Sequence, residues 1–370
     1  MKAANPEIRA AIVGVGNCAS TLVQGVSFYR RHPEETTGLM HADLGGLAVG
    51  DIHFACAFDV DARKVGQPLA KAIFAAPNNS RQICGDPGDD GARVFAGPVG
   101  DGVAAHLEKF DEARRAVVSP EAGGASLRSV VEILKQTRAT VLVNYLPVGS
   151  QKASELYAQA CLEAGIAMLN CIPVFIASDT APGGWAERFS RAGLPIIGDD
   201  IKSQFGATIT HRVLMKLAAE RGMAIDSSYQ LNVGGNTDFL NMLERSRLSS
   251  KKTSKTEAVT SQVPMEEKNI HIGPSDYIPF LADNKICYVR MNMRGFGNLP
   301  MELDMKLSVE DSPNSAGIVV DGLRCLALAQ RATKAGPLRE VSAVLMKRPP
   351  EQMRDDEAAA GMEKWIGSVT

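Results

Sequence analysis

The segment IRAAIVGVGNCAS, Ile8–Ser20, decides the fold class of this chain. It begins with a short apolar run typical of a buried strand, and a turn containing Gly14 and Gly16 follows. The next residues, 20–31, carry apolar side chains at helical spacing. Glycines between a strand and a helix let the backbone approach a pyrophosphate, which N–H groups at the helix N-terminus then bind. The segment therefore predicts a dinucleotide site, although Ala19 stands where a third glycine is usual.

An acidic residue ends the second expected strand, 52–59. Asp59 at this position would accept hydrogen bonds from the adenosine ribose hydroxyls, which favours NAD over NADP. The distance from the glycine turn is longer than usual because residues 30–50 form an insertion. Asp61 competes for the same role, and a helix cap is the alternative explanation for Asp59.

Strands and helices alternate through the rest of the first half of the chain. After an irregular stretch at 76–126, rich in Gly, Pro, Asp and Asn, strands are expected at 141–146, 166–173 and 194–200, with helices between them. This alternation predicts a parallel sheet with right-handed, doubly wound topology. Ligands gather at the carboxyl ends of such strands. The polar side chains expected there are Asn144, Asn170, Asp199 and Asp200.

The pattern changes after residue 200. The elements expected there are a helix at 207–222, a strand at 227–235, a helix from Asp238, strands at 268–276, 285–297 and 299–311, and a long helix at 312–336. The three later strands alternate apolar and polar residues, as antiparallel strands with one exposed face do. Ser312 or Asn314 is expected to cap the long helix. The predicted fold class is α/β, a Rossmann-type doubly wound parallel sheet with an inserted α+β domain and a C-terminal return to the first domain.

Two lysines, Lys251 and Lys255, lie four residues apart and project from one face of the helix expected after Asp238. Like charges at this spacing repel, so the pair suits a site that receives a phosphate and stabilises negative charge on oxygen. A solvated basic face is the alternative. The polar groups that favour a site are Asp199, Asp200, the small-residue turn Ser203, Gln204, Gly206, Ala207 and Thr208, and the loop residues Asn232, Asn236 and Asp238.

A dinucleotide site facing lysines, aspartates and amides implies a polyhydroxylated, phosphorylated substrate and chemistry that begins with hydride transfer. Lysine amines near one another and near a carbonyl can shuttle protons. A dehydrogenase needs one such group, whereas several suggest enolisation as well.

Composition excludes several classes of protein. The chain has 370 residues, 45% hydrophobic content and a net charge of −2, so it shows no signature of nucleic-acid binding. It lacks an apolar run of the roughly 18 residues that suggest a membrane span, and its N-terminus lacks a signal-peptide pattern. Seven scattered cysteines without CxxC predict reduced thiols in a cytoplasmic protein. The six histidines show no metal-binding spacing, which leaves any cation undecided.

Eight segments together resemble the inositol-1-phosphate synthases (1L-myo-inositol-1-phosphate synthases), in their shorter actinobacterial-type form. They are GVGNCAS (14–20), NYLPVGS (144–150), IPVFIASD (172–179), GDDIKSQFGATITHR (198–212), QLNVGGNTDFLNMLERSRLSSKKTSKTEAV (230–259), HIGPSD (271–276), DSPNSAG (311–317) and LMKRPP (345–350). The resemblance implies a homotetramer with bound NAD that converts D-glucose 6-phosphate to 1D-myo-inositol 3-phosphate. It also implies C5 oxidation, enolisation at C6, ring closure onto C1 and re-reduction, with a divalent or monovalent cation in some members.

The resemblance implies three parts and a set of roles. The parts are an NAD-binding Rossmann domain at 1–200, a catalytic and tetramerisation domain at 201–310, and a returning segment at 311–370. The implied catalytic residues are Lys251 at the C5 hydroxyl, Lys255 at the phosphate and enolate, Lys347 at oxygen, Asp200 as an orienting group, Asp311 near the nicotinamide, and Lys285. Lys285 is a hypothesis, because the family's GDSK lysine aligns with Asp276 here.

The implied cofactor contacts are Gly14, Gly16, Asn17, Cys18, Ala19, Asp59, Asn144, Leu146, Pro147, Asp199 and Ser312. The implied substrate contacts are Lys202, Ser203, Gln204, Ala207, Thr208, Asn232, Asn236 and Asp238, and the KSQFGAT segment departs here from the KSGQT of longer members. The alternative role for Asp199 is that of a cap or of a structural partner for Lys202. The alternative for Lys347 is a solvated position in a loop. Competing functions are a plain NAD-dependent phosphosugar dehydrogenase, an inactive NAD-binding regulator, and a synthase for another hexose phosphate or inositol isomer.

Overall fold

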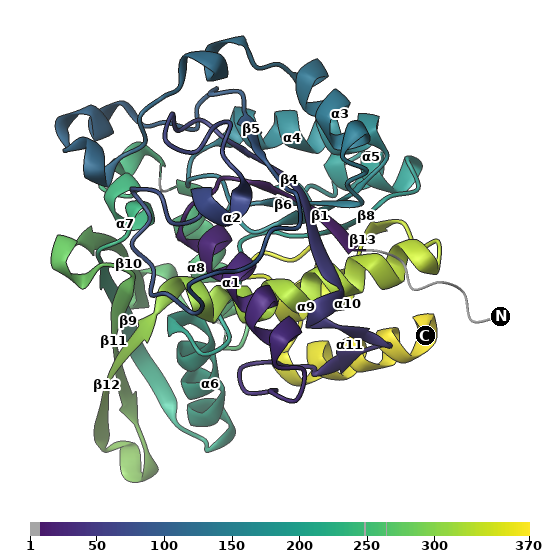
Figure 1. The fold of residues 1–370 in the computed structure, drawn as a ribbon. Coiled ribbons are helices and arrows are strands. Elements are labelled where there is room, and N and C mark those ends of the chain that lie inside the picture. Colours follow the sequence, from purple (N-terminus) through teal and green to yellow (C-terminus); the bar gives the residue numbers. More distant parts are fainter. Residues whose placement is uncertain (1–7, 248, 264) are drawn as a thin grey trace.

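A parallel sheet forms the centre of the molecule (Figure 1). The computed structural model describes residues 8–247, 249–263 and 265–370. The strands are β1 (Ile8–Val13), β4 (Ile52–Asp59), β5 (Val94–Ala96), β6 (Val141–Asn144), β7 (Ala167–Asn170), β8 (Pro195–Ile197) and β13 (Gly336–Pro337). Their order is β13-β8-β7-β6-β1-β4-β5, and every pairing is parallel. The chain reverses its direction of travel across the sheet between β1 and β6, so the predicted doubly wound topology is confirmed and its ligand-binding switch point lies there.

Helices cover both faces of this sheet. One face carries α1 (Asn17–Arg31), α9 (Asp311–Arg331), α10 (Arg339–Leu345) and α11 (Asp355–Val369), and the other carries α3 (Leu127–Gln136), α4 (Gln151–Ala164) and α5 (Trp185–Arg191). The short α2 spans Leu69–Ala72, and a small hairpin pairs β2 (Asp43–Leu44) with β3 (Leu47–Ala48). Because both faces are covered, β6 and β7 are buried at every position, which explains their uninterrupted apolar pattern.

A second sheet carries the inserted domain and extends to one side of the molecule in Figure 1. Its strands are β9 (Ala224–Gly234), β10 (Ile270–Tyr277), β11 (Asn284–Arg294) and β12 (Pro300–Glu310), in the order β10-β9-β11-β12. Helices α6 (Ala207–Glu220) and α8 (Ser249–Thr260) pack on one face of it. The antiparallel prediction is correct for β11 and β12 but wrong for β10, which runs parallel to β9. The helical crossover between β9 and β10 returns the chain to the same end of the sheet and so imposes the parallel pairing.

The helix expected from Asp238 is divided. A short helix α7 (Thr237–Asn241) ends first, a turn at Arg245–Arg247 follows, and the lysines lie on the separate helix α8. Arg247 donates to the carbonyl oxygens of Val148 (3.0 Å) and Asp101 (2.8 Å), which ties the turn to the first domain and redirects the chain.

The expected caps of the long helix are also wrong. Helix α9 starts at Asp311 with Glu310 as its cap residue, so Ser312 and Asn314 lie inside it. The Asn314 side chain instead accepts a hydrogen bond from the Phe205 N–H and donates one to the Phe205 carbonyl oxygen. The predicted C-terminal return is confirmed, because α9 lies in the core and β13 joins the edge of the parallel sheet. Among the described residues, no helix is both long enough and apolar enough to cross a membrane.

Candidate active site

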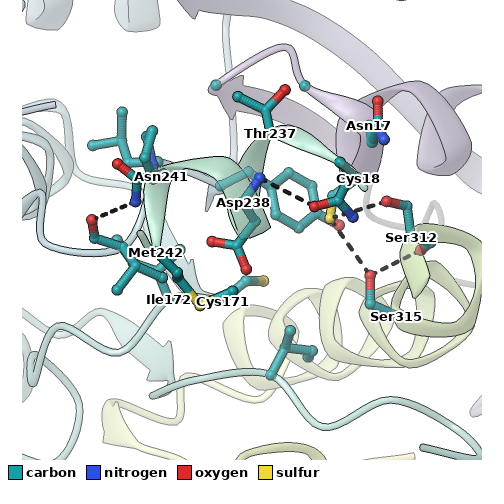
Figure 2. Close-up of a pocket in the computed structure, with 18 of the residues that line it drawn as sticks. Asn17, Cys18, Cys171, Ile172, Thr237, Asp238, Asn241, Met242, Ser312 and Ser315 are labelled. Carbon is teal, nitrogen blue, oxygen red and sulfur yellow. Dashed lines mark hydrogen bonds between the residues drawn. The ribbon is translucent and has the colours of Figure 1, made fainter. Parts of the chain in front are cut away.

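A cavity lies between the carboxyl ends of the parallel strands and the inserted domain, and Figure 2 shows part of its wall. It brings together most of the residues predicted from the sequence. The predicted residues that line it are Gly14, Gly16, Asn17, Cys18, Asp59, Leu146, Pro147 and Ser312 for the cofactor, Ser203, Ala207, Thr208, Asn232, Asn236 and Asp238 for the substrate, and Asp200, Lys255, Lys285, Asp311 and Lys347 for catalysis. Lys251 lies on α8, but its side chain is outside the described part of the structure.

The glycine turn is held at one end of the cavity by three side chains. Gly14 has φ +86°, and a Cβ atom at this position would lie 2.7 Å from the carbonyl oxygen of Tyr145, so only glycine fits. The N–H group of Val15 donates to Asp59 Oδ2 at 2.7 Å. Its carbonyl oxygen accepts from Lys64 Nζ at 2.6 Å and from the Asn78 amide at 3.1 Å. The turn is therefore fixed before any ligand binds.

Asp59 lies at the cavity wall as predicted, and it also supports the backbone around it. Its Oδ1 accepts from the N–H groups of Val60 (2.7 Å) and Asp61 (2.9 Å). Asp61, the competitor for the ribose role, is instead paired with the guanidinium of Arg63. Asp59 keeps lone pairs for a ribose hydroxyl, because a carboxylate offers about four acceptor sites and three are used.

A lysine and an aspartate form an ion pair in the cavity wall. Lys347 Nζ lies 2.8 Å from Asp200 Oδ1, with side-chain exposures of 13% and 4%. Ser254 on α8 donates to the other carboxylate oxygen. The backbone fixes the pair as well, because the Lys347 N–H donates to the Asp200 carbonyl oxygen at 2.7 Å. Lys347 is thus not a solvated loop residue.

A second ion pair joins Lys285 on β11 to Asp311 at the start of α9. The distance from Lys285 Nζ to Asp311 Oδ1 is 3.0 Å. Burial opposes the charge on Lys285, but the adjacent Asp311 carboxylate outweighs it, so the pKa of Lys285 lies above its usual value. Lys285 therefore carries a positive charge at neutral pH, as stabilisation of an oxyanion requires.

The far end of the cavity offers hydrogen-bonding groups. Ala207 and Thr208 form the first turn of α6, where free N–H groups and the helix dipole favour a negatively charged group. Lys255 lines the same cavity. Asn232 Nδ2 and Gln230 Oε1 are buried in the same wall and have no hydrogen-bond partner among the described residues. Buried polar groups without partners are unfavourable, so these two are positioned to bond a polar ligand.

Three predicted cofactor contacts lie behind the cavity wall. Asp199 is fully buried and accepts from Asn170 Nδ2 (2.7 Å) and from the N–H groups of residues 176–178. Burial raises the pKa of Asp199 to about 6. Asn144 donates to Asn170 Oδ1 (2.9 Å) and accepts from the N–H of Leu146, and Ala19 is fully buried in the core. Asp199 and Asn144 therefore stabilise the segments that follow the strand ends, and Ala19 is a core residue.

Two predicted substrate contacts also point elsewhere. Lys202 Nζ donates to the carbonyl oxygen of Ala343 at 2.6 Å, and burial lowers the pKa of Lys202 to about 7. Gln204 Nε2 donates to the carbonyl oxygen of Gly38 at 2.6 Å. Both are absent from the described lining of the cavity. In the described part of the chain Lys202 does not bond Asp199, so their pairing is not supported, whereas the alternative structural role of Asp199 fits its hydrogen bonds to residues 176–178.

Comparison with known proteins assigns the chain to one family. The sequence model described as "Myo-inositol-1-phosphate synthase" matches residues 206–312, which span most of the inserted domain and end at Ser312. The chain is 52% identical over 368 residues to the inositol-3-phosphate synthase of Mycolicibacterium smegmatis, covering 97% of this chain and 98% of that protein. The chain belongs to the myo-inositol-1-phosphate synthase family. The predicted resemblance and enzyme class are thus confirmed.

Solved structures agree with the synthase fold. The crystal structure of Ari2 is 33% identical, covers 98% of this chain and 99% of its own, and superposes with a TM-score of 0.78. The inositol-3-phosphate synthase of Caenorhabditis elegans superposes with a TM-score of 0.77 at 17% identity, covering 98% of this chain and 86% of its own, which supports the fold alone.

The residues at or behind the cavity wall that the sequence analysis did not predict include Lys64, Gln230, Ser254 and Asp283. Gln230 lies two residues before Asn232 on the same strand, so the period of two could have revealed that both face the cavity. Ser254 directly precedes Lys255. Lys64 and Asp283 act through contacts with residues far away in the chain, which no local pattern shows.

Proposed function

We propose that this chain uses NAD to convert D-glucose 6-phosphate into 1D-myo-inositol 3-phosphate without net oxidation or reduction. The observation that carries the proposal is that one cavity joins a glycine turn suited to a dinucleotide to two lysine–aspartate pairs and a helix N-terminus suited to a phosphate. A simple dehydrogenase needs the first of these features and one acid–base group. The additional lysines favour chemistry that also passes through an enolate.

The proposed NAD site lies along the first domain. The pyrophosphate would lie against the glycine turn and the first N–H groups of α1, at the switch point of the sheet. Asp59 would accept from the adenosine ribose, and Leu146 and Pro147 would pack against the cofactor. Bound NAD would supply the acceptor, and later the donor, of the hydrogen at C5.

The proposed substrate site lies under the inserted domain. The phosphate would bind the N–H groups at the start of α6 and the ammonium of Lys255. Hydroxyl groups of the sugar would bond Asn232 Nδ2 and Gln230 Oε1, two atoms that have no hydrogen-bond partner among the described residues. Asn236 and Asp238 line the same wall.

The ion pairs suggest how protons and charge are handled. In the first step a base must take the proton of the C5 hydroxyl, and Lys251 or the Lys347–Asp200 pair is proposed for this role. A neutral amine in the wall would then take a proton from C6, which gives an enolate whose oxygen Lys255 and Lys285 would stabilise. In ring closure C6 attacks C1, and the aldehyde oxygen takes a proton from an ammonium group in the wall. Asp311 keeps Lys285 charged throughout.

Self-association is proposed for the exposed face of the second sheet. Tyr229 and Leu231 of β9 and Tyr288 of β11 are 38%, 43% and 43% exposed and point away from α6 and α8. The hairpin between β11 and β12 exposes further apolar side chains, including Phe296 and Leu299. Such a patch suits a subunit interface, so we propose the homotetramer implied by the family. Light scattering coupled to size exclusion tests this assembly.

A cation and the cellular location are lesser parts of the proposal. The described residues contain no group of three or more His, Cys, Asp or Glu side chains that could hold a metal ion. A cation requirement is therefore tested directly, by assaying activity after chelation and after adding back single cations. All seven cysteines are free thiols, which fits the proposed cytoplasmic location.

Product analysis tests the proposed reaction. Purified protein is incubated with glucose 6-phosphate and NAD, the products are identified by phosphorus and carbon NMR, and absorbance is followed at 340 nm. An inositol phosphate without accumulation of NADH supports the synthase. NADH formed in equal amount with a keto sugar would instead establish the competing dehydrogenase.

A further inference from the structure

Asp283 is a buried carboxylate at the junction of the two domains. Its side chain is 1% exposed and lies in the short connection before β11. Oδ1 accepts three hydrogen bonds, from Asn17 Nδ2 (2.9 Å), Asn236 Nδ2 (3.0 Å) and Ser312 Oγ (2.8 Å). Oδ2 accepts a fourth from the Ser312 N–H at 3.1 Å. Neither the chain pattern nor the family resemblance pointed to this residue.

The three partners of Asp283 come from three separate parts of the site. Asn17 is the first residue of α1 after the glycine turn, Asn236 caps α7 beside the substrate end, and Ser312 lies in the first turn of α9. All three line the cavity, whereas Asp283 is absent from its described lining. Figure 2 shows Cys18 beside Ser312 in the cavity wall, with Asn17 on the same side of the view.

The backbone of Asp283 extends the same arrangement. Its carbonyl oxygen accepts a hydrogen bond from the Asp311 N–H at 3.0 Å. Asp311 forms an ion pair with Lys285, which follows Asp283 by two residues in the sequence. The carboxylate of Asp283 thus contacts the nucleotide turn and the substrate wall, and its backbone carbonyl oxygen contacts the residue that pairs with Lys285. Burial raises the pKa of Asp283, and the negative charge of Asp311 raises it further. Both effects disfavour the charged carboxylate, and the hydrogen bonds from its donors offset them.

We propose that Asp283 is a positioning residue, which fixes Asn17 for cofactor binding and Asn236 and the Lys285–Asp311 pair for the substrate. The inference rests on the proposed function of the cavity. It means that the cofactor and substrate halves of the site are assembled through one side chain. A change at Asp283 therefore affects NAD affinity and turnover together, although Asp283 contacts neither ligand.

The test uses Asp283→Asn in the full chain. The variant keeps the shape but removes one acceptor, so an amide group must face either Ser312 N–H or the three donors at the other oxygen. NAD affinity is measured by calorimetry after charcoal treatment, and turnover is measured at a temperature well below the melting temperatures of all variants. We expect NAD to bind on the order of 10-fold more weakly, as loss of hydrogen bonds to a charged group predicts, and kcat to fall by about 100-fold, as misplaced groups predict.

The matched control is Asp321→Asn. Asp321 is also a fully buried carboxylate of α9, but it pairs with Arg324 and His41 outside the described cavity lining. This variant should lose thermal stability while NAD affinity and kcat stay within about twofold of the wild type. If both variants lose activity in proportion to their melting temperatures, Asp283 has a structural role only and the proposal is overturned.

A double-mutant cycle with Asn17→Ala tests the route through the nucleotide turn. If Asp283 acts on NAD through Asn17, Asp283→Asn has no further effect once Asn17 is removed, so the double variant binds NAD as Asn17→Ala alone does, within about twofold. Independent, multiplicative losses would refute this route. Should Asp283→Asn fail to fold, Ser312→Ala removes one of the same hydrogen bonds and enters the same cycle.

The wild-type product assay is run in parallel. If the wild type forms no inositol phosphate, the proposed function fails, while the NAD titrations still decide the role of Asp283 on their own.

Discussion

Replacement of Lys347 by methionine separates catalysis from stability at the centre of the cavity. The change removes the ammonium 2.8 Å from Asp200 Oδ1 and leaves a carboxylate that is 4% exposed with Ser254 as a remaining partner. Removal of one partner of a buried ion pair costs about 3–5 kcal/mol. Because Ser254 and the edge of the cavity offset part of this cost, we expect a loss of about 3 kcal/mol.

This free energy converts to a measurable shift. The entropy of unfolding is about 2.1 cal/mol/K per residue, so over 370 residues a loss of about 3 kcal/mol lowers the melting temperature by about 4 °C. Turnover should fall by about 100-fold or more, since an acid–base group typically contributes this much. Calorimetry and the product assay measure the two effects on the same preparation.

The double variant Asp200→Asn/Lys347→Met provides the decisive comparison. It removes the unpaired charge, so the melting temperature should recover towards the wild-type value, while turnover stays low because the reacting groups are gone. Recovery of both stability and turnover in the double variant would show that the pair is only structural. Normal turnover in Lys347→Met alone would refute the catalytic role directly.

Three further changes follow from the structure. Lys285→Ala should abolish turnover with NAD still bound, because Asp311 holds this lysine charged at the substrate; near-normal turnover would exclude the role. Gly14→Ala should prevent NAD binding in a titration, because its φ is +86° and the added Cβ meets backbone at 2.7 Å; wild-type affinity would contradict this. The Asp321 hydrogen bond raises the pKa of His41 from 6.5 to about 9, so its stabilisation is complete below pH 6.5 and is lost as the pH rises through 9. The difference in melting temperature between wild type and His41→Gln should therefore be large at pH 6 and small at pH 10, and a constant difference would disprove the linkage.

Local patterns were sufficient to predict the first strand, turn and helix of the nucleotide-binding half. The apolar run, glycine turn and helix at Ile8–Ser20 form β1, the turn and the start of α1, because each depends on neighbours within a few residues. The same holds for Asp59, whose place at a strand end brings it to the cavity. The spacing of apolar residues and the residue types in turns thus predict those helices and strands whose stabilising contacts are close along the chain.

Predictions failed where distant contacts decide the outcome. Ser312 and Asn314 read as caps, but Asp283 and Phe205 take their hydrogen bonds, and α9 starts without a side-chain cap. Asp199 and Asn144 lie at strand ends as predicted, but their polar groups already form hydrogen bonds within the protein. Both bond Asn170, and both accept from nearby backbone N–H groups. Polar residues at the end of a buried strand must be satisfied first, so their position alone does not identify a ligand contact.

The fate of the hydrogen at C5 tests the central claim most directly. Glucose 6-phosphate carrying deuterium at C5 is converted in ordinary water with a catalytic amount of NAD, and the product is examined by NMR and mass spectrometry. Oxidation and re-reduction of the same carbon within one cavity predict an inositol phosphate that keeps the deuterium at that carbon. Deuterium lost to water, or found on released NADH beside a keto sugar, would contradict the account.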